Sequence, residues 1–315
     1  MSTDAPLSGP LIAVVGPTAT GKTDLALRLA LAFDGEIVGA DSRQVYRHLD
    51  VGTAKPTPEQ RTQVPHWLID VVDPNEEFSL RRYLDLAGEA LTDIWSRGKR
   101  PFLVGGSGQY VWGLLEGWQV PRVAPDGDLR RSLEERAQRD GPEALYRELA
   151  AVDAAAATRI DARNVRRVVR ALEIHALSDQ RLLSTPARLR PPFDALILAI
   201  DWPRAELYRR IDARVDAMFA AGLVDEVSGL LARGYTADLP SLSGIGYRQV
   251  CQYLVGEFSL ADAVAKMKTE THRVARMQST WFRRDDPRIR WLDALAGDPF
   301  DEAAGMVRSS LDREE

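Results

Sequence analysis

Cysteine and histidine are scarce in this chain, and their scarcity excludes several kinds of site. Cys251 is the only cysteine among 315 residues, so neither an internal disulfide framework nor a cysteine-based zinc module can form. The four histidines are scattered, and no two of them have the spacing of zinc ligands. We therefore expect a protein without zinc.

Long apolar runs and a basic leader are also lacking. No apolar stretch reaches the ~20 residues that cross a bilayer, and residues 1–10 hold an acid and two prolines where a signal peptide has basic residues. The net charge is −5, which argues against a globally basic nucleic-acid-binding protein but leaves a local basic patch open. We expect no membrane partner, a cytoplasmic location and a monomer.

The sequence does contain alternating strand and helix patterns. Leu11–Val15 is a continuous apolar run typical of a buried parallel strand, and Asp24–Phe33 after it has helical apolar spacing. The alternation recurs up to a strand that ends in glycines, which predicts an α/β domain with a mostly parallel sheet flanked by helices. The other expected strands are 36–40, 66–72, 101–104 and 195–200, with a further helix at 80–95.

The pattern changes after about residue 120. Asp128–Leu177 has no convincing strand and is typical of short helices, whereas Ala195–Ile200 is a strand again. We therefore expect an all-helical insertion domain at 122–190 within a core made of 1–121 and 191–315. The C-terminal part is expected to be helical, with a long last helix near Leu260–Arg284. The helices expected in the insertion are 129–139, 142–150, 153–159 and 164–177.

A phosphate-binding loop follows the first strand. Residues 16–23, GPTATGKT, match G-x-x-x-x-G-K-[ST], and a strand and a helix flank them as this P-loop motif requires. Its glycines let backbone N–H groups curl around an anion, Lys22 reaches phosphates, and the Thr23 hydroxyl suits Mg²⁺. The loop predicts a polyphosphate site, and ATP and a non-nucleotide diphosphate both remain open. The expected phosphate-binding residues are Gly16, Thr18, Ala19, Thr20, Gly21, Lys22 and Thr23.

Two other strand ends carry candidate site residues. Asp41 follows the strand 36–40, where it could hold Mg²⁺ through water or act as a general base. It could equally cap the N-terminus of a following helix. Residues 105–108, Gly-Gly-Ser-Gly, follow the strand 101–104 and suit either close approach to a ligand or a tight strand-to-helix turn.

Positive charge is concentrated in two segments. Residues 161–170 carry four arginines at spacings that form one basic helix face. Residues 266–290 hold eight Lys and Arg against three acids. Each segment could be an ordinary solvated face, but the contrast with the acidic remainder of the chain favours contact with nucleic acid.

Together these motifs resemble the tRNA dimethylallyltransferase family of bacterial type. The resemblance implies transfer of a dimethylallyl group from dimethylallyl diphosphate to N6 of adenosine 37, with release of diphosphate and Mg²⁺ as cofactor. The tRNAs would carry adenosine at positions 36 to 38 of the anticodon loop. The stretches that carry it are GPTATGKT (16–23), ADSRQVYRHLDVGTAKP (40–56), LVGGSGQY (103–110), DARNVRRVVRALEI (161–174), RIDARVDAMFAAGLVDEV (210–227), GIGYRQ (244–249) and RVARMQSTWFRR (273–284).

The resemblance also implies residue roles. Asp41 would be the base or hydrogen-bond acceptor at the adenine amine, and Ser107 would contact a donor phosphate or that amine. Arg214, in preference to Arg210, would clamp the diphosphate. The residues implied along the tRNA path are Asp41, Ser42, Arg43, Gln44, Ser107, Arg130, Asp161, Arg163, Asn164, Arg166, Gly246, Tyr247, Arg248, Arg276, Gln278, Trp281 and Arg283.

Two other functions fit part of the pattern. A P-loop kinase of a small molecule would have the phosphate loop and an acid after the second strand, but it would not need the basic helices. A non-enzymatic RNA-binding module would have the basic helices but leaves Lys22, Thr23 and Asp41 unexplained. Salt-dependent tRNA binding separates the kinase from the other two, and consumption of the prenyl donor separates the transferase from the binding module.

Overall fold

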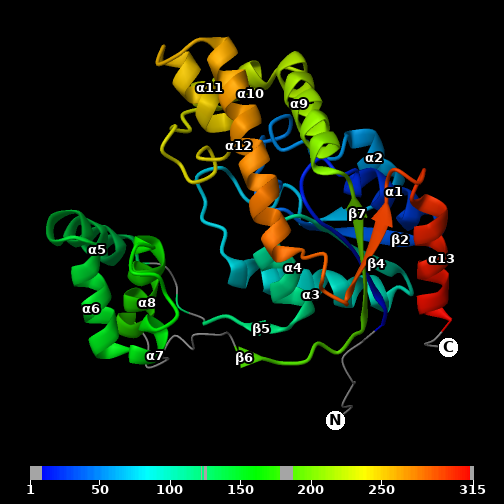
Figure 1. Cartoon of the computed structure of the whole chain (residues 1–315), viewed down its shortest axis with the longest axis horizontal. Coiled ribbons are helices and arrows are strands. Elements are labelled where there is room, and N and C mark those ends of the chain that lie inside the picture. Colours follow the sequence, from blue (N-terminus) through cyan, green and yellow to red (C-terminus); the bar gives the residue numbers. More distant parts are fainter. Residues whose placement is uncertain (1–8, 122, 124–125, 178–186, 313–315) are drawn as a thin grey trace. The chain divides into compact units, whose positions relative to one another are not determined.

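The structure, a computed structural model, describes residues 9–121, 123, 126–177 and 187–312 (Figure 1). The chain divides into two units, Met1–Leu115 with Pro191–Glu315, and Glu116–Arg190. The second unit begins before the expected residue 122, because a short strand at its start pairs with one near its end. Within the described part of the chain, every helix is too short or too polar to span a bilayer.

Six parallel strands form the centre of the first unit, in the order β3-β2-β4-β1-β7-β8. The central strand β1 is buried at every position and pairs with β4 on one side and β7 on the other. A strand buried on both faces needs the continuous apolar run seen in its sequence. The strands are β1 (Leu11–Val15), β2 (Gly35–Ala40), β3 (His66–Trp67), β4 (Arg100–Gly105), β7 (Ala195–Asp201) and β8 (Ile289–Asp293).

Two features of the sheet differ from expectation. The strand predicted over 66–72 is only two residues long, because Leu68 and Asp70 adopt φ values of 64° and 57° that break the extended backbone. The edge strand β8 was not expected. Only two of its five residues are buried, so it lacks the continuous apolar run by which the other strands were found.

Helices pack against the sheet and close its core. The helices α1 and α13 pack on each other and against strands, with Leu29, Phe102 and Val307 in one buried cluster. The helix α3 contacts β2 and β4 and packs on α4. These helices, together with the short α2, are α1 (Lys22–Ala32), α2 (Pro58–Gln63), α3 (Leu80–Ser96), α4 (Gly108–Leu115) and α13 (Phe300–Leu311).

Four further helices follow β7 and pack on one another as Figure 1 shows. Their buried cluster also contains Val45, Leu49 and Val72, which come from the loops after β2 and β3. These loops are therefore held against the helices. The helices are α9 (Arg204–Ala220), α10 (Leu223–Ala232), α11 (Tyr247–Leu254) and α12 (Leu260–Trp281), and α12 ends before the expected Arg284.

The second unit has a core of its own. Leu133, Leu149, Val168 and Leu172 are among the buried residues of that core. All four expected helices are present, and an antiparallel two-stranded ribbon, which was not expected, joins the ends of the unit. The elements are α5 (Gly127–Asp140), α6 (Pro142–Val152), α7 (Ala154–Ala157), α8 (Val165–Leu177), β5 (Trp118–Gln119) and β6 (Ala187–Arg188).

Candidate active site

The phosphate loop connects the carboxyl end of β1 to the first turn of α1. Gly16 and Gly21 adopt φ values of 127° and 98°, which favour glycine, and Ala19 adopts 64°. A left-handed residue with a side chain is uncommon and is typical of strained functional loops. No side chain caps α1, which begins at Lys22. The N–H groups of its first turn, together with the helix dipole, therefore suit an anion.

Two side chains from the region after β7 hold the loop from outside. Trp202 donates its indole N–H to the carbonyl of Thr20 at 2.9 Å. Arg210 donates from Nε to the carbonyl of Ala19 at 2.9 Å, and its guanidinium lies 4.4 Å from the ring centroid of Trp202. The curvature of the loop is thus fixed before any ligand binds, which is the condition for electrostatic preorganisation.

Gln278 joins the phosphate loop to the turn after β4. Its Oε1 accepts the N–H of Thr18 at 2.9 Å, and its Nε2 donates to the carbonyl of Gly106 at 3.0 Å. A Cβ on Gly106 would lie 2.5 Å from Nε2 of Gln278, and one on Gly108 would lie 2.2 Å from Cγ of Trp281. The glycines therefore form a strand-to-helix turn that admits the end of α12.

Two cavities meet beside the phosphate loop. The larger, of about 520 Å³, is lined by the loop, the residues after β2 and the helices α9, α11 and α12. The smaller, of about 60 Å³, includes Lys22 and Thr23 in its lining. Four residues line both cavities, namely Thr18, Asp41, Arg214 and Gln278. This arrangement suits an anion at the loop and a larger group on the other side of the shared residues.

Two half-buried cations, Lys22 and Arg214, lie beside these cavities with the carboxylate of Asp41. Burial chiefly, and then the positive charge of Arg214, lower the pKa of Lys22 to about 7, while Asp41 opposes the shift. Burial also lowers the pKa of Arg214, again against the effect of Asp41. Two neighbouring cations that are partly removed from water are costly without a counter-charge. The pair therefore favours a ligand with more than one negative charge, such as a diphosphate.

Asp41 is held by the turn after β2. Its Oδ1 accepts the N–H of Arg43 at 2.8 Å and that of Gln44 at 3.4 Å. Residues 42–45 form a turn and not a helix, so the alternative in which Asp41 caps a helix is wrong. Ser107 lies against the same turn, since its Oγ accepts the N–H of Ser42 at 3.0 Å and donates to the hydroxyl of Ser42 at 3.3 Å.

Thr23 and Asp41 bring oxygen donors to the smaller cavity. Among the described residues, no group of three His, Cys, Asp or Glu side chains could hold a metal ion. Mg²⁺ does not need such a cage, because it usually keeps several waters and is shared between one or two protein oxygens and substrate phosphates. The hydroxyl and the carboxylate therefore fit Mg²⁺ when a diphosphate supplies the other ligands.

Comparison with known proteins assigns this site to a family. A model of IPP transferases matches residues 44–285, and a model of isopentenyl transferases matches residues 10–70. The chain is 52% identical to the tRNA dimethylallyltransferase of Roseiflexus sp. strain RS-1, over 96% of this chain and 99% of that protein. The chain belongs to the tRNA dimethylallyltransferase family.

Solved structures of similar proteins agree with this assignment. The full-length tRNA isopentenylpyrophosphate transferase of Bacillus halodurans is 38% identical, with a TM-score of 0.71 over 96% of this chain and 97% of that one. A eukaryotic dimethylallyltransferase, seen in crystallographic snapshots acting on tRNA, is 28% identical with a TM-score of 0.77. That match covers 91% of this chain and 74% of the eukaryotic one.

The sequence offered two candidates for the arginine that clamps the donor phosphates. Arg214 lines both cavities, and its positive charge contributes to the lowered pKa of Lys22. Arg210 is engaged on the outside of the phosphate loop instead. The structure therefore places the preferred candidate in the site.

The residues expected along the tRNA path are divided between the two units. Tyr247 is 1% exposed and its hydroxyl donates to Glu226 at 2.7 Å, so most of its side chain lies in the core, while the residue also lines the larger cavity. Arg130 forms an ion pair with the buried Glu173, and Arg248 pairs with Glu270. Arg130, Asp161, Arg163, Asn164 and Arg166 lie in the second unit, and Asp41, Ser42, Arg43, Gln44, Ser107, Gly246, Tyr247, Arg248, Arg276, Gln278, Trp281 and Arg283 lie in the first.

Sequence reasoning missed several residues around the site. Trp202 gave no signal, because an aromatic residue after a strand is usually part of the core. His66 was expected only as a strand residue. It lines the smaller cavity, its Nδ1 donates to the carbonyl of Val64 at 2.7 Å, and its buried Nε2 has no hydrogen-bond partner among the described residues. Lys55 stood within the stretch 40–56, but nothing in the sequence marked it as buried.

Proposed function

We propose that this protein transfers a dimethylallyl group from dimethylallyl diphosphate to N6 of adenosine 37 in the anticodon loop of tRNA. The tRNAs carry adenosine at positions 36 to 38, and diphosphate is released. The observation that carries the proposal is the meeting of an anion site and a larger cavity at Asp41 and Arg214. Membership of the tRNA dimethylallyltransferase family supports it.

The residues at the junction divide the chemistry between them. The C–N bond to the prenyl carbon forms as the C–O bond to the diphosphate breaks, and the electron pair leaves with the diphosphate. Lys22, Arg214 and the N–H groups of the phosphate loop stabilise that leaving charge. Asp41 accepts the proton or the hydrogen bond of the amine, whose nitrogen is otherwise a weak nucleophile. An unpaired loop base costs little to unstack, so it can enter the cavity.

Mg²⁺ is part of the proposal, held by the Thr23 hydroxyl with Asp41 nearby. When bound, it neutralises charge on the donor's phosphates. The phosphate loop in this proposal takes the prenyl donor and not a nucleotide consumed for energy. We further propose a zinc-free monomer that works in the cytoplasm on tRNA.

The test is an incubation of the protein with Mg²⁺, dimethylallyl diphosphate and bulk tRNA, in the absence of ATP. Mass spectrometry of the digested tRNA should find an adenosine heavier by one dimethylallyl group, and nuclease fragments should map it to position 37. Absence of this nucleoside, together with consumption of ATP on a small acceptor, would instead establish a kinase.

Asp41→Asn tests the base within this reaction. The asparagine oxygen can still accept the N–H of Arg43, so the turn is kept while the charge is lost. We expect the turnover number to fall ~10²–10⁴-fold, as for loss of a general base, with tRNA affinity little changed. Turnover by Asp41→Asn at the wild-type rate would remove Asp41 from this role.

A further inference from the structure

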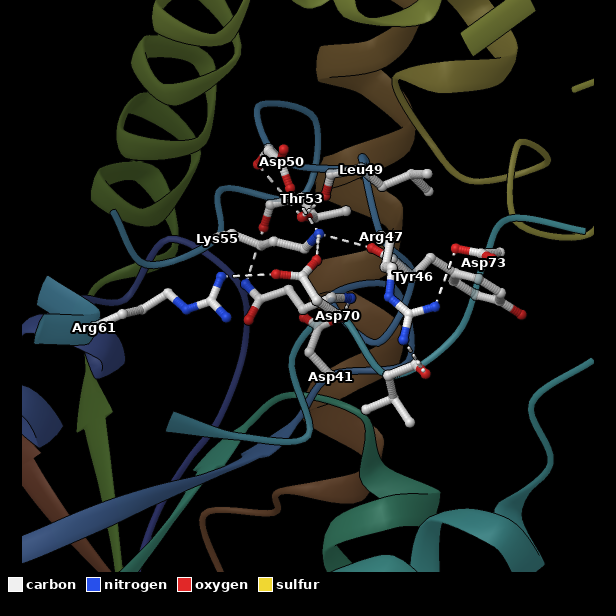
Figure 2. Close-up of polar contacts among 12 residues, drawn as sticks. Asp41, Tyr46, Arg47, Leu49, Asp50, Thr53, Lys55, Arg61, Asp70 and Asp73 are labelled. Atoms are coloured by element: carbon white, nitrogen blue, oxygen red, sulfur yellow. Dashed lines mark hydrogen bonds and ion pairs between the residues drawn. The ribbon is translucent and has the colours of Figure 1, made fainter. Parts of the chain in front are cut away.

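We propose that Lys55 is a positioning residue for Asp41. The segment 41–55, here called the Asp41 loop, leaves β2 at Asp41 and ends at Lys55, whose ammonium points toward Tyr46 and Asp70 (Figure 2). The inference rests on the proposed function, because it concerns the geometry of the group assigned as base. It concerns a residue that touches neither cavity.

Lys55 is a buried cation with all of its donors in use. Its side chain is 4% exposed. Its Nζ donates to the carbonyl of Tyr46 at 2.7 Å, to Asp50 at 2.7 Å and to Asp70 at 2.6 Å. An ammonium has three N–H donors, so the three acceptors satisfy it completely. Lysine is almost never fully buried unless it is paired, and this pairing ties two loops together.

Asp70 is the partner from the other loop. Its carboxylate is shared, with Lys55 on Oδ1 and Arg61 on Oδ2 at 2.7 Å. Its backbone N–H donates to the carbonyl of Gln44 at 3.2 Å. Lys55 therefore holds Asp70, and Asp70 is hydrogen-bonded to the backbone of Gln44. Figure 2 shows Lys55 and Arg61 approaching Asp70 from different directions.

Gln44 carries the restraint to Asp41. Its Nε2 donates to the carbonyls of Thr53 and Ala54 at 3.1 and 3.3 Å, the two residues before Lys55. Its backbone N–H lies 3.4 Å from Oδ1 of Asp41. Lys55 is therefore connected to Gln44 in two ways, through the neighbouring residues Thr53 and Ala54 and through Asp70. Gln44 in turn contacts the carboxylate of Asp41.

Strained backbone in both loops shows that these contacts are needed. Four residues other than glycine have left-handed φ values: His48 at 66°, Ala54 at 46°, Leu68 at 64° and Asp70 at 57°. Such conformations persist only where surrounding contacts over-determine them. Loss of the Lys55 ammonium would let Ala54 and Asp70 relax, and the turn that holds Asp41 would move with them.

Residues 50–52 of the loop have an anchor besides Lys55. The carboxylate of Glu226, on α10, accepts the N–H groups of Asp50, Val51 and Gly52 at 2.8, 2.7 and 3.1 Å. The loop therefore stays attached to the helices when Lys55 is changed. We therefore expect the main effect of such a change at the end of the loop that carries Asp41.

The test is Lys55→Met, which keeps the apolar stem and removes the three donors. In single-turnover prenylation at saturating tRNA and donor, we expect the rate to fall ~10²-fold, the cost typical of a misplaced catalytic group. The dissociation constants for inorganic diphosphate and for tRNA should change little, and they also report that the variant is folded. Ile94→Ala, a core change in α3, serves as a destabilised control and should keep the wild-type rate below its melting temperature.

A double-mutant cycle separates positioning from general stability. If Lys55 acts through Asp41, Lys55→Met should cause almost no further loss in an Asp41→Asn background. Asp70→Asn should lower the rate by a smaller factor, and this loss should also disappear in the Asp41→Asn background. Asp70→Asn replaces Lys55→Met in the test if Lys55→Met does not fold. A wild-type rate for Lys55→Met would overturn the inference. So would a double variant in which the two rate losses multiply. In either case the proposed function stands as long as the wild-type protein is active. An inactive wild-type protein would overturn both.

Discussion

Lys22 is a residue whose charge depends on what the site contains. Its ordinary pKa of 10.5 is lowered to about 7, first by burial and then by Arg214. A bound diphosphate favours the charged ammonium and so raises this pKa again. At pH 8 we therefore expect Lys22 to be mostly neutral in the free protein, and we expect proton uptake when diphosphate binds.

Proton uptake is measurable by calorimetry. Inorganic diphosphate should bind at pH 8 with a heat that depends on the ionisation enthalpy of the buffer, in the direction of proton uptake by the protein. The affinity should weaken as the pH rises above about 7, because the lysine must then be protonated at increasing cost. Lys22→Met is the control, because proton uptake by this variant reports the protonation of the ligand alone. Proton uptake by Lys22→Met equal to that by the wild type would contradict the prediction.

Residues of the site could be predicted where a motif fixes the backbone. The glycines at 16 and 21 define the phosphate loop by their spacing, and Lys22 follows from it. Lys55 could not be found in this way, since its burial depends on Asp70, which a separate loop brings to it. The burial of Tyr247 could not be predicted for the same reason, because the sequence does not show that Glu226 binds its hydroxyl inside the core.

At the scale of elements, the turn between β4 and α4 receives the end of α12. Gly108 begins α4, and the ring of Trp281 occupies the space where its Cβ would lie. The indole N–H of Trp112 also donates to the carbonyl of Trp281 at 2.9 Å. The same segment of α12 carries Gln278 onto the phosphate loop, so packing at this turn supports the diphosphate site.

Gly108→Ala should therefore destabilise the protein by about 1–3 kcal/mol, the usual cost of overpacking, and weaken binding of inorganic diphosphate. Gly88→Ala is the matched control. Gly88 lies within α3, and a Cβ at this position would have open space for 4 Å around it, so alanine should stabilise the helix by ~0.5–1 kcal/mol. Thermal melts and diphosphate titration of both variants check the prediction, and equal melting temperatures would contradict it.

Strands with a continuous apolar run could be predicted from the sequence, and strands without one could not. The strands β1 and β4 are buried almost throughout, and their sequences show it. The strand β8 has charged residues at exposed positions on a sheet edge, and the ribbon β5–β6 has two residues a side. Such short or half-exposed strands form because a partner strand pairs with them. The pattern of residues along one segment does not show which partner it will meet.

At the scale of the whole molecule, the lysines and arginines of the basic segments differ in whether their charge is free to bind tRNA or is already paired with an acid. In α12 and the residues after it, Lys268, Arg284 and Arg288 form ion pairs with acids. In α8 of the second unit, Arg170 is bound to Glu173, whose side chain is fully buried. The local excess of positive charge read from the sequence is thus partly used within the fold.

Arg166 and Arg167 differ from Arg170, because both are exposed and neither forms an ion pair within the described part of the chain. If they bind tRNA phosphates, Arg166→Gln with Arg167→Gln should weaken tRNA binding on all sequences alike. The slope of log affinity against log salt should become shallower by ~1 for each phosphate that the variant no longer neutralises.

Arg170→Gln is the control for this prediction. It should lower the melting temperature, because it removes a partner of the buried Glu173, and leave the salt slope as in the wild type. Binding titrations at several salt concentrations distinguish the two variants. An unchanged slope in the double arginine variant would mean that the exposed face of α8 is only solvated, and that the electrostatic interaction with tRNA lies elsewhere on this acidic protein.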